Sequence, residues 1–368
     1  MISRRSVSAN TILEKAHNSS NYSDLLPLAS VIRLCISFCP AAFAQAFSVP
    51  IRKEPLMLSF TDFTQEFVSA CTASLQSRYY ADAVLEQGSI IKPQLGELTA
   101  LRFSRPDSTI APTLYAEDMY SVYKSGRAIA DIADEAADVI SYSLDIQPDI
   151  TEADLDLNAS AGALRVRLLN KTRNRELLEN TAYKDVGSGF VLIADIVKGE
   201  FRALISNELV RDSGMTNDML FELALANSAS EGAVLCDLAD ALPGPCKAKN
   251  LLELPEGENF EDDGSAYVLT NRTSFWGAAA LFYPGVMQKL HDLFGDFYVL
   301  PSSVHEVLLV PLSAECDPEN LARMVREANR TVVEDKDILA DDLYACISGE
   351  IVRVSYDGEI PESCRCVS

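Results

Sequence analysis

Apolar residues recur at two different spacings along this chain, and the change from one to the other is the feature that most limits its fold. Over residues 60–76, 115–123 and 129–140 they recur at helical spacing, which predicts three amphipathic helices. Residues 98–103 form a strand-like run between the first two of these helices. The sequence therefore predicts a mainly helical N-terminal part over residues 57–158.

After residue 158 short β runs alternate with capped helices. Residues 190–227 and 297–329 each have the pattern of a hairpin followed by a helix that begins at a capping residue, and we expect these two β-β-α units to share one sheet. The other expected elements are strands at 164–169, 267–270, 277–282 and 351–356, a helix at 284–294 that begins with Pro284, and a helix at 337–346. The predicted fold class is α+β, with a mixed or antiparallel sheet domain over residues 159–356 and a flexible tail over residues 357–368.

Residues 1–56 differ in charge and pattern from the rest of the chain. They hold six basic and three acidic residues, a net charge of +3, while the whole chain carries −23 and residues 57–368 therefore −26. Their apolar stretch is broken by Pro27, Arg33 and Pro40, which excludes a transmembrane helix because a span needs about 20 nearly uninterrupted apolar residues. We interpret this segment as an extension that is either disordered or placed before the true start of translation at Met57.

Two observations concern the compartment. Ala42-Phe43-Ala44 has the small-x-small pattern of a signal cleavage site, so export is an alternative. The cysteines after residue 56 are odd in number and scattered, which favours reduced thiols and a cytoplasmic protein. They are Cys71, Cys236, Cys246, Cys316, Cys346, Cys364 and Cys366. The sequence leaves the role of the last two, a Cys-x-Cys pair in the tail, open.

The composition excludes several classes of protein. Hydrophobic residues make up 48% of the chain, too many for a disordered acidic protein. The charge of −23 repels phosphate backbones, so we expect no nucleic-acid partner. Only His291 and His305 follow residue 56, too few for a histidine-rich zinc site, and no nucleotide-binding motif occurs. We therefore expect a soluble acidic protein with no metal and no cofactor.

Several segments in the same order resemble a bacterial family catalogued as a domain of unknown function, number 5688. They include APTLYAEDMYSVYKSGR (111–127), GFVLIADIV (189–197), ISNELVRDSGMTNDMLFELALAN (205–227), GAAALFYPGVMQKL (277–290) and YVLPSSVHEVLLVP (298–311). The resemblance covers about residues 57–356, and residues 205–345 are more distantly similar to another such family, number 1444. It implies an α+β fold and a cytosolic bacterial setting, and it implies no activity.

The segment Ser302-Ser303-Val304-His305-Glu306 brings hydroxyls, an imidazole and a carboxylate within five residues. Nucleophilic catalysis needs a hydroxyl hydrogen-bonded to a base that a third group orients. In a straight strand Ser303 and His305 share a face but lie about 7 Å apart, so only a tight turn could join them. The alternative is that the hydroxyls bond to the backbone of a turn while His305 packs at the start of a strand.

One basic cluster interrupts the acidic sequence. It consists of Arg165, Arg167, Lys171, Arg173 and Arg175. Because arginine side chains match phosphate and carboxylate groups, this basic cluster is a candidate for binding a phosphate or an acidic partner. The alternative is that it neutralises acidic neighbours.

Two functions follow from these observations. The absence of a complete catalytic motif favours a non-enzymatic binding or accessory protein with a protein or small-molecule partner. The alternative is a hydrolase-like enzyme with Ser302 or Ser303 as nucleophile, His305 as base and Glu306 beside it.

Overall fold

The computed structural model describes residues 57–78, 80–106, 111–145, 152–199, 201–238, 248–255, 266–313 and 316–354. The predicted extension over residues 1–56, its signal-like pattern, the tail over residues 357–368 and the Cys-x-Cys pair lie outside the described residues.

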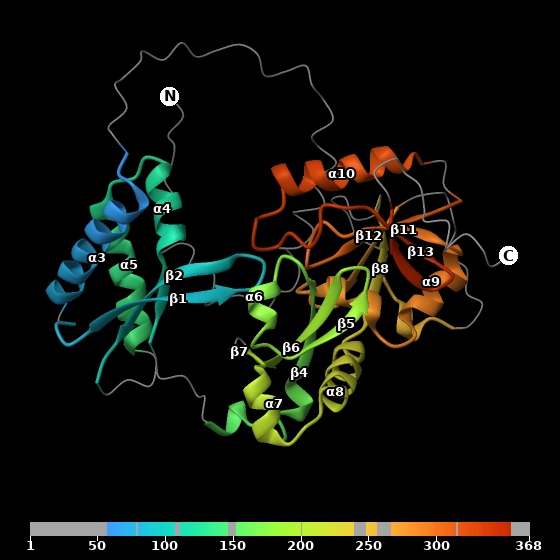
Figure 1. Cartoon of the computed structure of the whole chain (residues 1–368), viewed down its shortest axis with the longest axis horizontal. Helices are drawn as coiled ribbons and strands as arrows, with labels where there is room; N and C mark the ends of the chain where they lie inside the picture. The colour runs from blue at the N-terminus through green and yellow to red at the C-terminus, as the bar shows by residue number, and fades with distance from the viewer. Residues whose placement is uncertain are drawn as a thin grey trace, which may run out of the picture.

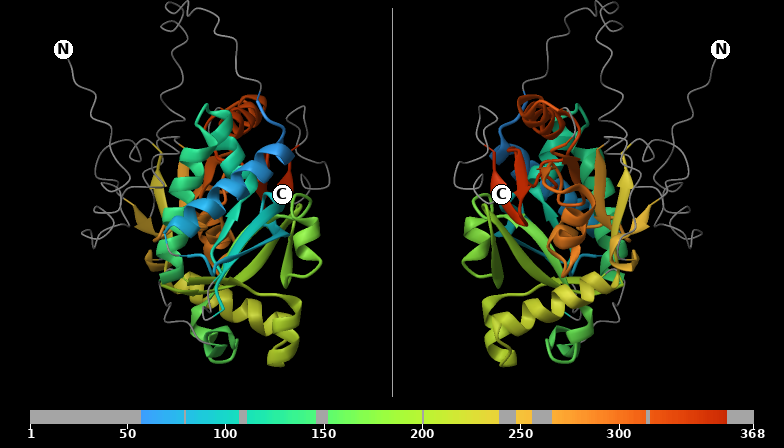
Figure 2. Two further views of the ribbon diagram at one scale, coloured as in Figure 1. Left: turned by 90° about the vertical axis from the view of Figure 1, so that its left-hand side faces the viewer. Right: turned by 90° about the vertical axis from the view of Figure 1, so that its right-hand side faces the viewer.

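Three helices and a small antiparallel sheet make up the N-terminal part (Figure 1). The helices are α3 (Phe60–Ser77), α4 (Ala116–Lys124) and α5 (Ile129–Asp145), and the strands are β1 (Val84–Lys92), β2 (Gly96–Ser104) and β3 (Thr113–Tyr115). Apolar side chains from the helices and from β2 form one buried core, and the helices lie together on one side of the molecule (Figure 2). The three predicted helices are confirmed. Strand β1 was missed because most of its side chains are exposed and it has no apolar alternation.

The rest of the described chain forms two antiparallel sheets with helices around them. One sheet has the order β4 (Leu164–Asn170), β6 (Phe190–Lys198), β5 (Tyr183–Gly187), with β7 (Phe201–Leu204) also pairing with β6. The other has the order β14 (Glu350–Arg353), β13 (Tyr344–Ile347), β11 (Phe297–Leu300), β12 (Val307–Pro311), β10 (Tyr267–Asn271), β8 (Ala233–Asp237), β9 (Lys249–Asn250). The helices are α6 (Arg175–Leu178), α7 (Asn207–Ser213), α8 (Asn217–Ser230), α9 (Val286–Phe294) and α10 (Pro318–Thr331). The α+β fold class is confirmed.

The two β-β-α units exist, but they do not share a sheet. The hairpin β6–β7 precedes α7 and α8, and the hairpin β11–β12 precedes α10. Their strands lie in different sheets, so the expectation of one shared sheet was wrong. The reason is that alternate residues of both sheets point into one core, where the rings of Phe190 and Tyr344 lie 4.7 Å apart. The units are therefore joined by packing between sheets and not by hydrogen bonds between strands.

Three local predictions were wrong. Gly277–Phe282 forms the 3-10 helix η5 and not a strand, because its small residues pack between the sheets with Gly277 to Leu281 all buried. The segment 337–346 is not helical, since Ile338 forms an isolated bridge to Ser303 and β13 follows. Helix α9 begins at Val286 after the left-handed Gly285, so Pro284 is not its first residue.

Two further findings concern the cysteines and the helices. Cys236 is disulfide-bonded, so the expectation of reduced thiols was wrong for this residue. Cys71, Cys316 and Cys346 are free thiols. Among the described residues no helix is both long and apolar enough to cross a bilayer. The cytoplasmic setting and the domain boundaries stay predictions.

Candidate ligand-binding cleft

A cleft of about 990 Å³ lies where the turn between β1 and β2 reaches the larger C-terminal part of the described chain. We call it the hairpin cleft. One wall is formed by the β1–β2 turn with Tyr115 and Asp118. The others are formed by Arg167 and Leu169 on β4, by the segments 273–276 and 304–306, and by residues 334, 336 and 337. In the ribbon the β1–β2 hairpin extends from the N-terminal helices toward α6 (Figure 1). The cleft therefore depends on segments that are far apart in the sequence.

Gln94 fastens the turn to the opposite wall. Its side chain is 7% exposed, and its backbone is left-handed with φ 66°. Its backbone N–H donates to Asn174 Oδ1 at 2.7 Å, and its side-chain amide donates to the carbonyl of Ile338. The Asn174 amide donates in return to Gln94 Oε1. Because buried amides are costly to leave without partners, this reciprocal contact fixes the position of the turn.

The loop between β10 and η5 presents two aromatic side chains to the cleft. Asn271 organises it, because its Oδ1 accepts the backbone N–H of Phe275 at 3.2 Å and its amide donates to the carbonyl of Phe275 at 2.9 Å. Ser274 and Trp276 both have left-handed backbones, with φ 53° and 57°. A positive φ costs roughly 1–2 kcal/mol for a residue with a side chain, and such strain clusters at functional sites. The loop is thus held in a strained form that positions Phe275 and Trp276.

Gly277 lets this loop pass close to the opposite segment. A Cβ atom at this position would lie 2.0 Å from Thr270 Oγ1 and 2.5 Å from the carbonyl oxygen of His305. The same carbonyl accepts the hydroxyl of Thr270 at 2.8 Å. Only glycine fits here, and its absence of a side chain brings the aromatic loop against the backbone of His305.

Both ring nitrogens of His305 contact groups of the protein. Nδ1 accepts the backbone N–H of Trp276 at 3.2 Å, so Nδ1 carries no proton in this arrangement. Nε2 lies 3.2 Å from Oδ1 of Asp337 and donates to it. The ring also packs against Phe275, with centroids 5.2 Å apart. The imidazole is therefore fixed in one tautomer and one orientation.

The hydroxyl of Ser303 does not reach the His305 ring. Its Oγ accepts the backbone N–H of His305 at 3.0 Å, and the hydroxyl bonds to the carboxyl of Glu306. Ser302 and Ser303 are both buried. Glu306 is also buried, and this burial raises the pKa of its carboxyl to about 7, although His305 and Ser303 act in the opposite direction. Residues 302–306 thus contain a Ser303–Glu306 pair, and His305 forms a separate pair with Asp337, which lies outside this segment.

The five members of the basic cluster are spread over different sites. Arg165 pairs with Glu231 at 2.5 Å, and Lys171 pairs with Asp185 at 2.6 Å. Arg175 makes no ion pair with another described residue and lines a separate hollow of about 800 Å³ together with Lys171 and Arg173. Arg173 makes only a long contact, 3.8 Å, with Asp341.

Arg167 is the one member that lines the hairpin cleft. Its guanidinium forms a bidentate pair with the buried Asp195, with a shortest distance of 2.7 Å. The same guanidinium stacks over the ring of Trp276 at 3.9 Å. Arg167 therefore holds the Trp276 ring in place, because its planar guanidinium can pair with Asp195 and stack on the ring at the same time.

Sequence reasoning missed Asp337, Trp276 and Gln94. Asp337 falls within the helix that the sequence predicts over residues 337–346, and Gln94 lies in a turn that has no recognisable motif. Trp276 did carry a signal, since it is the one tryptophan of the chain and follows another aromatic residue.

The other described histidine, His291, lies partly exposed on α9 and does not line the hairpin cleft, and its Nε2 lies 3.9 Å from Asp296. No group of three or more His, Cys, Asp or Glu side chains within the described ranges is arranged to hold a metal ion.

The chain belongs to a family of unknown function, DUF5688, whose model matches residues 64–346. The predicted resemblance to this family is confirmed, while the distant similarity to family 1444 stays a prediction. The matched range includes every segment that lines the hairpin cleft. Comparisons with curated proteins and with solved structures gave no match.

Proposed function

We propose that this protein is a non-enzymatic binding protein that holds a small polar organic molecule in the hairpin cleft. The observation that carries the proposal is the strained loop at Ser274–Trp276, which presents aromatic rings beside the oriented His305–Asp337 pair. The volume of about 990 Å³ lies at the upper end of the range of about 300–1,000 Å³ that is typical of small-molecule sites. A flat group of the ligand would pack against Phe275, and its polar groups would bond to the carboxyl group of Asp337, which His305 orients.

The geometry gives less support to the Ser/His hydrolase alternative. A general base needs a nitrogen within hydrogen-bond reach of the nucleophile. Both nitrogens of His305 bond to Trp276 and Asp337, and the Ser303 hydroxyl bonds elsewhere. We therefore do not assign Ser302 or Ser303 as a nucleophile.

The basic cluster also gives less support to a binding role than the hairpin cleft does. Arg165, Arg167 and Lys171 are held by carboxylates at 2.5 to 2.7 Å. Such pairs support the alternative that these residues neutralise acidic neighbours. A phosphate or acidic partner at this cluster is a prediction that we do not carry into the proposed function.

The tryptophan in the cleft provides the experiment. Because Trp276 is the one tryptophan of the chain, its fluorescence reports directly on the hairpin cleft. A library of polar metabolites is screened for changes in this fluorescence and in the melting temperature of the wild-type protein. Compounds that change both are titrated against His305→Ala and against the matched surface variant His291→Ala.

Affinity should fall by roughly tenfold or more in His305→Ala and stay unchanged in His291→Ala, because only His305 lines the cleft. Circular dichroism establishes that His305→Ala is folded, and His305→Gln replaces it if it is not. A silent library, or equal affinity in both variants, would contradict the proposal. Turnover of an ester that Ser303→Ala abolishes would instead support the hydrolase alternative.

A further inference from the structure

We propose that the ligand of the hairpin cleft is an organic cation, a guanidinium on a short carbon chain. This inference rests on the proposed function and specifies the chemical class of the ligand. Three independent observations lead to it: the charge balance of the cleft, the aromatic loop, and the orientation of Asp337.

Carboxylates outnumber the available cations around the cleft. Its lining contains the acidic residues Asp118, Glu306, Glu334 and Asp337 and the basic residues Lys92, Arg167 and Lys336. Arg167 is already paired with the buried Asp195, and Lys336 with Glu334 at 2.8 Å. Lys92, whose ammonium lies 5.1 Å from the ring centroid of Tyr115, is the remaining cation of the lining, against three carboxyl groups.

The aromatic loop already binds cations of the chain itself. The guanidinium of Arg202 lies 4.6 Å from the ring centroid of Phe275, and that of Arg167 lies 3.9 Å from the ring centroid of Trp276. Cation–π contacts at exposed sites are worth about 0.5–1 kcal/mol. Phe275 is 38% exposed and Arg202 is also exposed, so a ligand cation with a second anchor can replace this contact. The ring faces are thus suited to flat cations.

Asp337 supplies the second anchor. Its Oδ1 accepts Nε2 of His305, and its side chain is 24% exposed toward the cleft region. An ionised carboxylate has about four acceptor positions, so oxygens remain for the N–H groups of a ligand. His305 holds this carboxylate in a fixed orientation, as a preorganised acceptor should be held.

The net charge of the whole protein also favours a cationic ligand. The chain carries a net charge of −23, which attracts cations to the surface and repels phosphates and carboxylates. Glu306, whose carboxyl lies buried at the cleft, would add a negative charge close to a bound cation once it is ionised.

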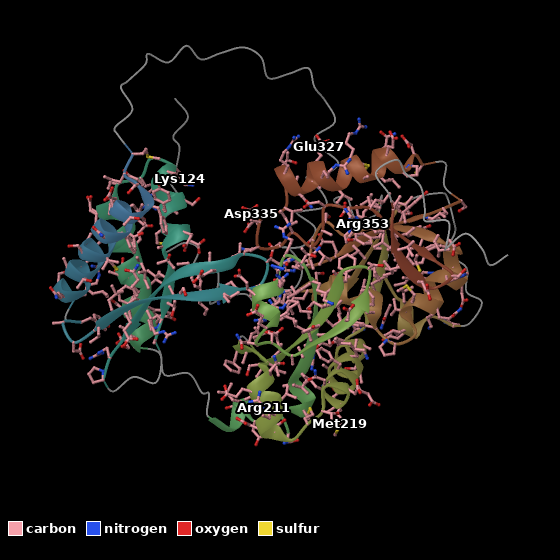
Figure 3. The ribbon with its side chains drawn as sticks, in the orientation of Figure 1. Lys124, Arg211, Met219, Glu327, Asp335 and Arg353 are labelled. Carbon is pink, nitrogen blue, oxygen red and sulfur yellow. The ribbon has the colours of Figure 1, made fainter. Side chains whose placement is uncertain are left out.

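The test compares three probes that share a butyl chain and differ in charge. Butylguanidinium is a cation, butylurea is its neutral isostere, and pentanoate is an anion. Each is titrated against the full-length protein by Trp276 fluorescence and by calorimetry, at about 0.05 M and about 0.5 M salt. The variants are Asp337→Asn, Glu306→Gln and the matched control Asp335→Asn, an exposed aspartate two positions away that does not line the cleft (Figure 3).

The cation should bind roughly tenfold or more tightly than butylurea, with a further loss at high salt, because a charged hydrogen bond is stronger than a neutral one. Asp337→Asn should weaken it by roughly tenfold and Asp335→Asn by less than about twofold. Glu306→Gln keeps the size of the side chain, so it tests the charge if Asp337→Asn does not fold. Equal or tighter binding of butylurea or pentanoate overturns the inference and leaves the small-ligand function standing. Failure of butylguanidinium to bind at millimolar concentration also overturns the inference. The proposed function itself is contradicted by the two outcomes given above, a silent metabolite library or equal affinity in the two histidine variants.

Discussion

The buried carboxyl of Glu306 makes the stability of this protein depend on pH, and Glu306→Gln should remove that dependence. Burial raises the pKa of Glu306 from its ordinary value of 4.5 to about 7. Because the folded pKa lies above the unfolded one, the folded state binds the proton more tightly than the unfolded chain does. The stability that this proton confers is complete below pH 4.5 and is lost as the pH rises through about 7.

The size of the loss follows from the shift in the pKa. One pKa unit corresponds to about 1.4 kcal/mol, so the complete loss is about 3 kcal/mol in the free energy of unfolding. The part that falls between about pH 5.5 and about pH 8.5 is about 2 kcal/mol, because most unfolded molecules have already released this proton at about pH 5.5. Glutamine has nearly the same shape and no charge, so the variant should not share this loss.

Urea unfolding at about pH 5.5 and about pH 8.5, followed by Trp276 fluorescence, measures the effect. The free energy of unfolding of Glu306→Gln minus that of the wild type should increase by about 2 kcal/mol between the two pH values. The control is Glu327→Gln, which changes an exposed glutamate on α10 (Figure 3) and should follow the wild type at both pH values. A difference that does not change with pH would refute the argument from burial, because Glu306 would then titrate alike in the folded and unfolded chain.

Three further predictions concern other residues. Gly277→Ala should destabilise the fold by about 3 kcal/mol or more, because its Cβ would overlap Thr270 Oγ1, and an unchanged melting temperature would contradict this. Gln94→Asn tolerates the left-handed backbone but shortens the amide, so urea unfolding should show a loss of about 2 kcal/mol, whereas an unchanged midpoint would mean that the turn is not fastened by this side chain. Reduction of the denatured protein should expose two additional titratable thiols because Cys236 is disulfide-bonded, and an equal count with and without reductant would contradict the bond.

The elements that the sequence predicted well are those with local signals. The side chain of Ser59 accepts the N–H of Asp62 at the start of α3, and Asp317 does the same for Glu319 at the start of α10. Both caps involve residues two or three positions apart, so the sequence alone specifies them. The helix predicted over 337–346 failed because this segment pairs with Ser303, a contact that its own residues do not indicate.

The candidate site was predictable only in part, for the same reason. His305 stood out because histidine is rare in this chain, but its partner Asp337 is one of 54 acidic residues and lies 32 positions away. The cleft also needs the β1–β2 turn, whose place beside Ile338 depends on how the N-terminal part packs against the rest. Local sequence patterns thus identified the wall that contains His305. The other walls of the cleft are formed by contacts between distant segments, which only the folded structure shows.

The contact between Gln94 and Ile338 spans 244 positions of the sequence. This contact closes a very long loop, so it can form only after residue 338 has been synthesised, and it carries a large entropic cost of loop closure that other contacts must offset. A fragment with only the helices, or only the two sheets, would lack one wall of the cleft. The ligand would then bind fully folded molecules and not partly folded ones, so it would stabilise the folded state alone.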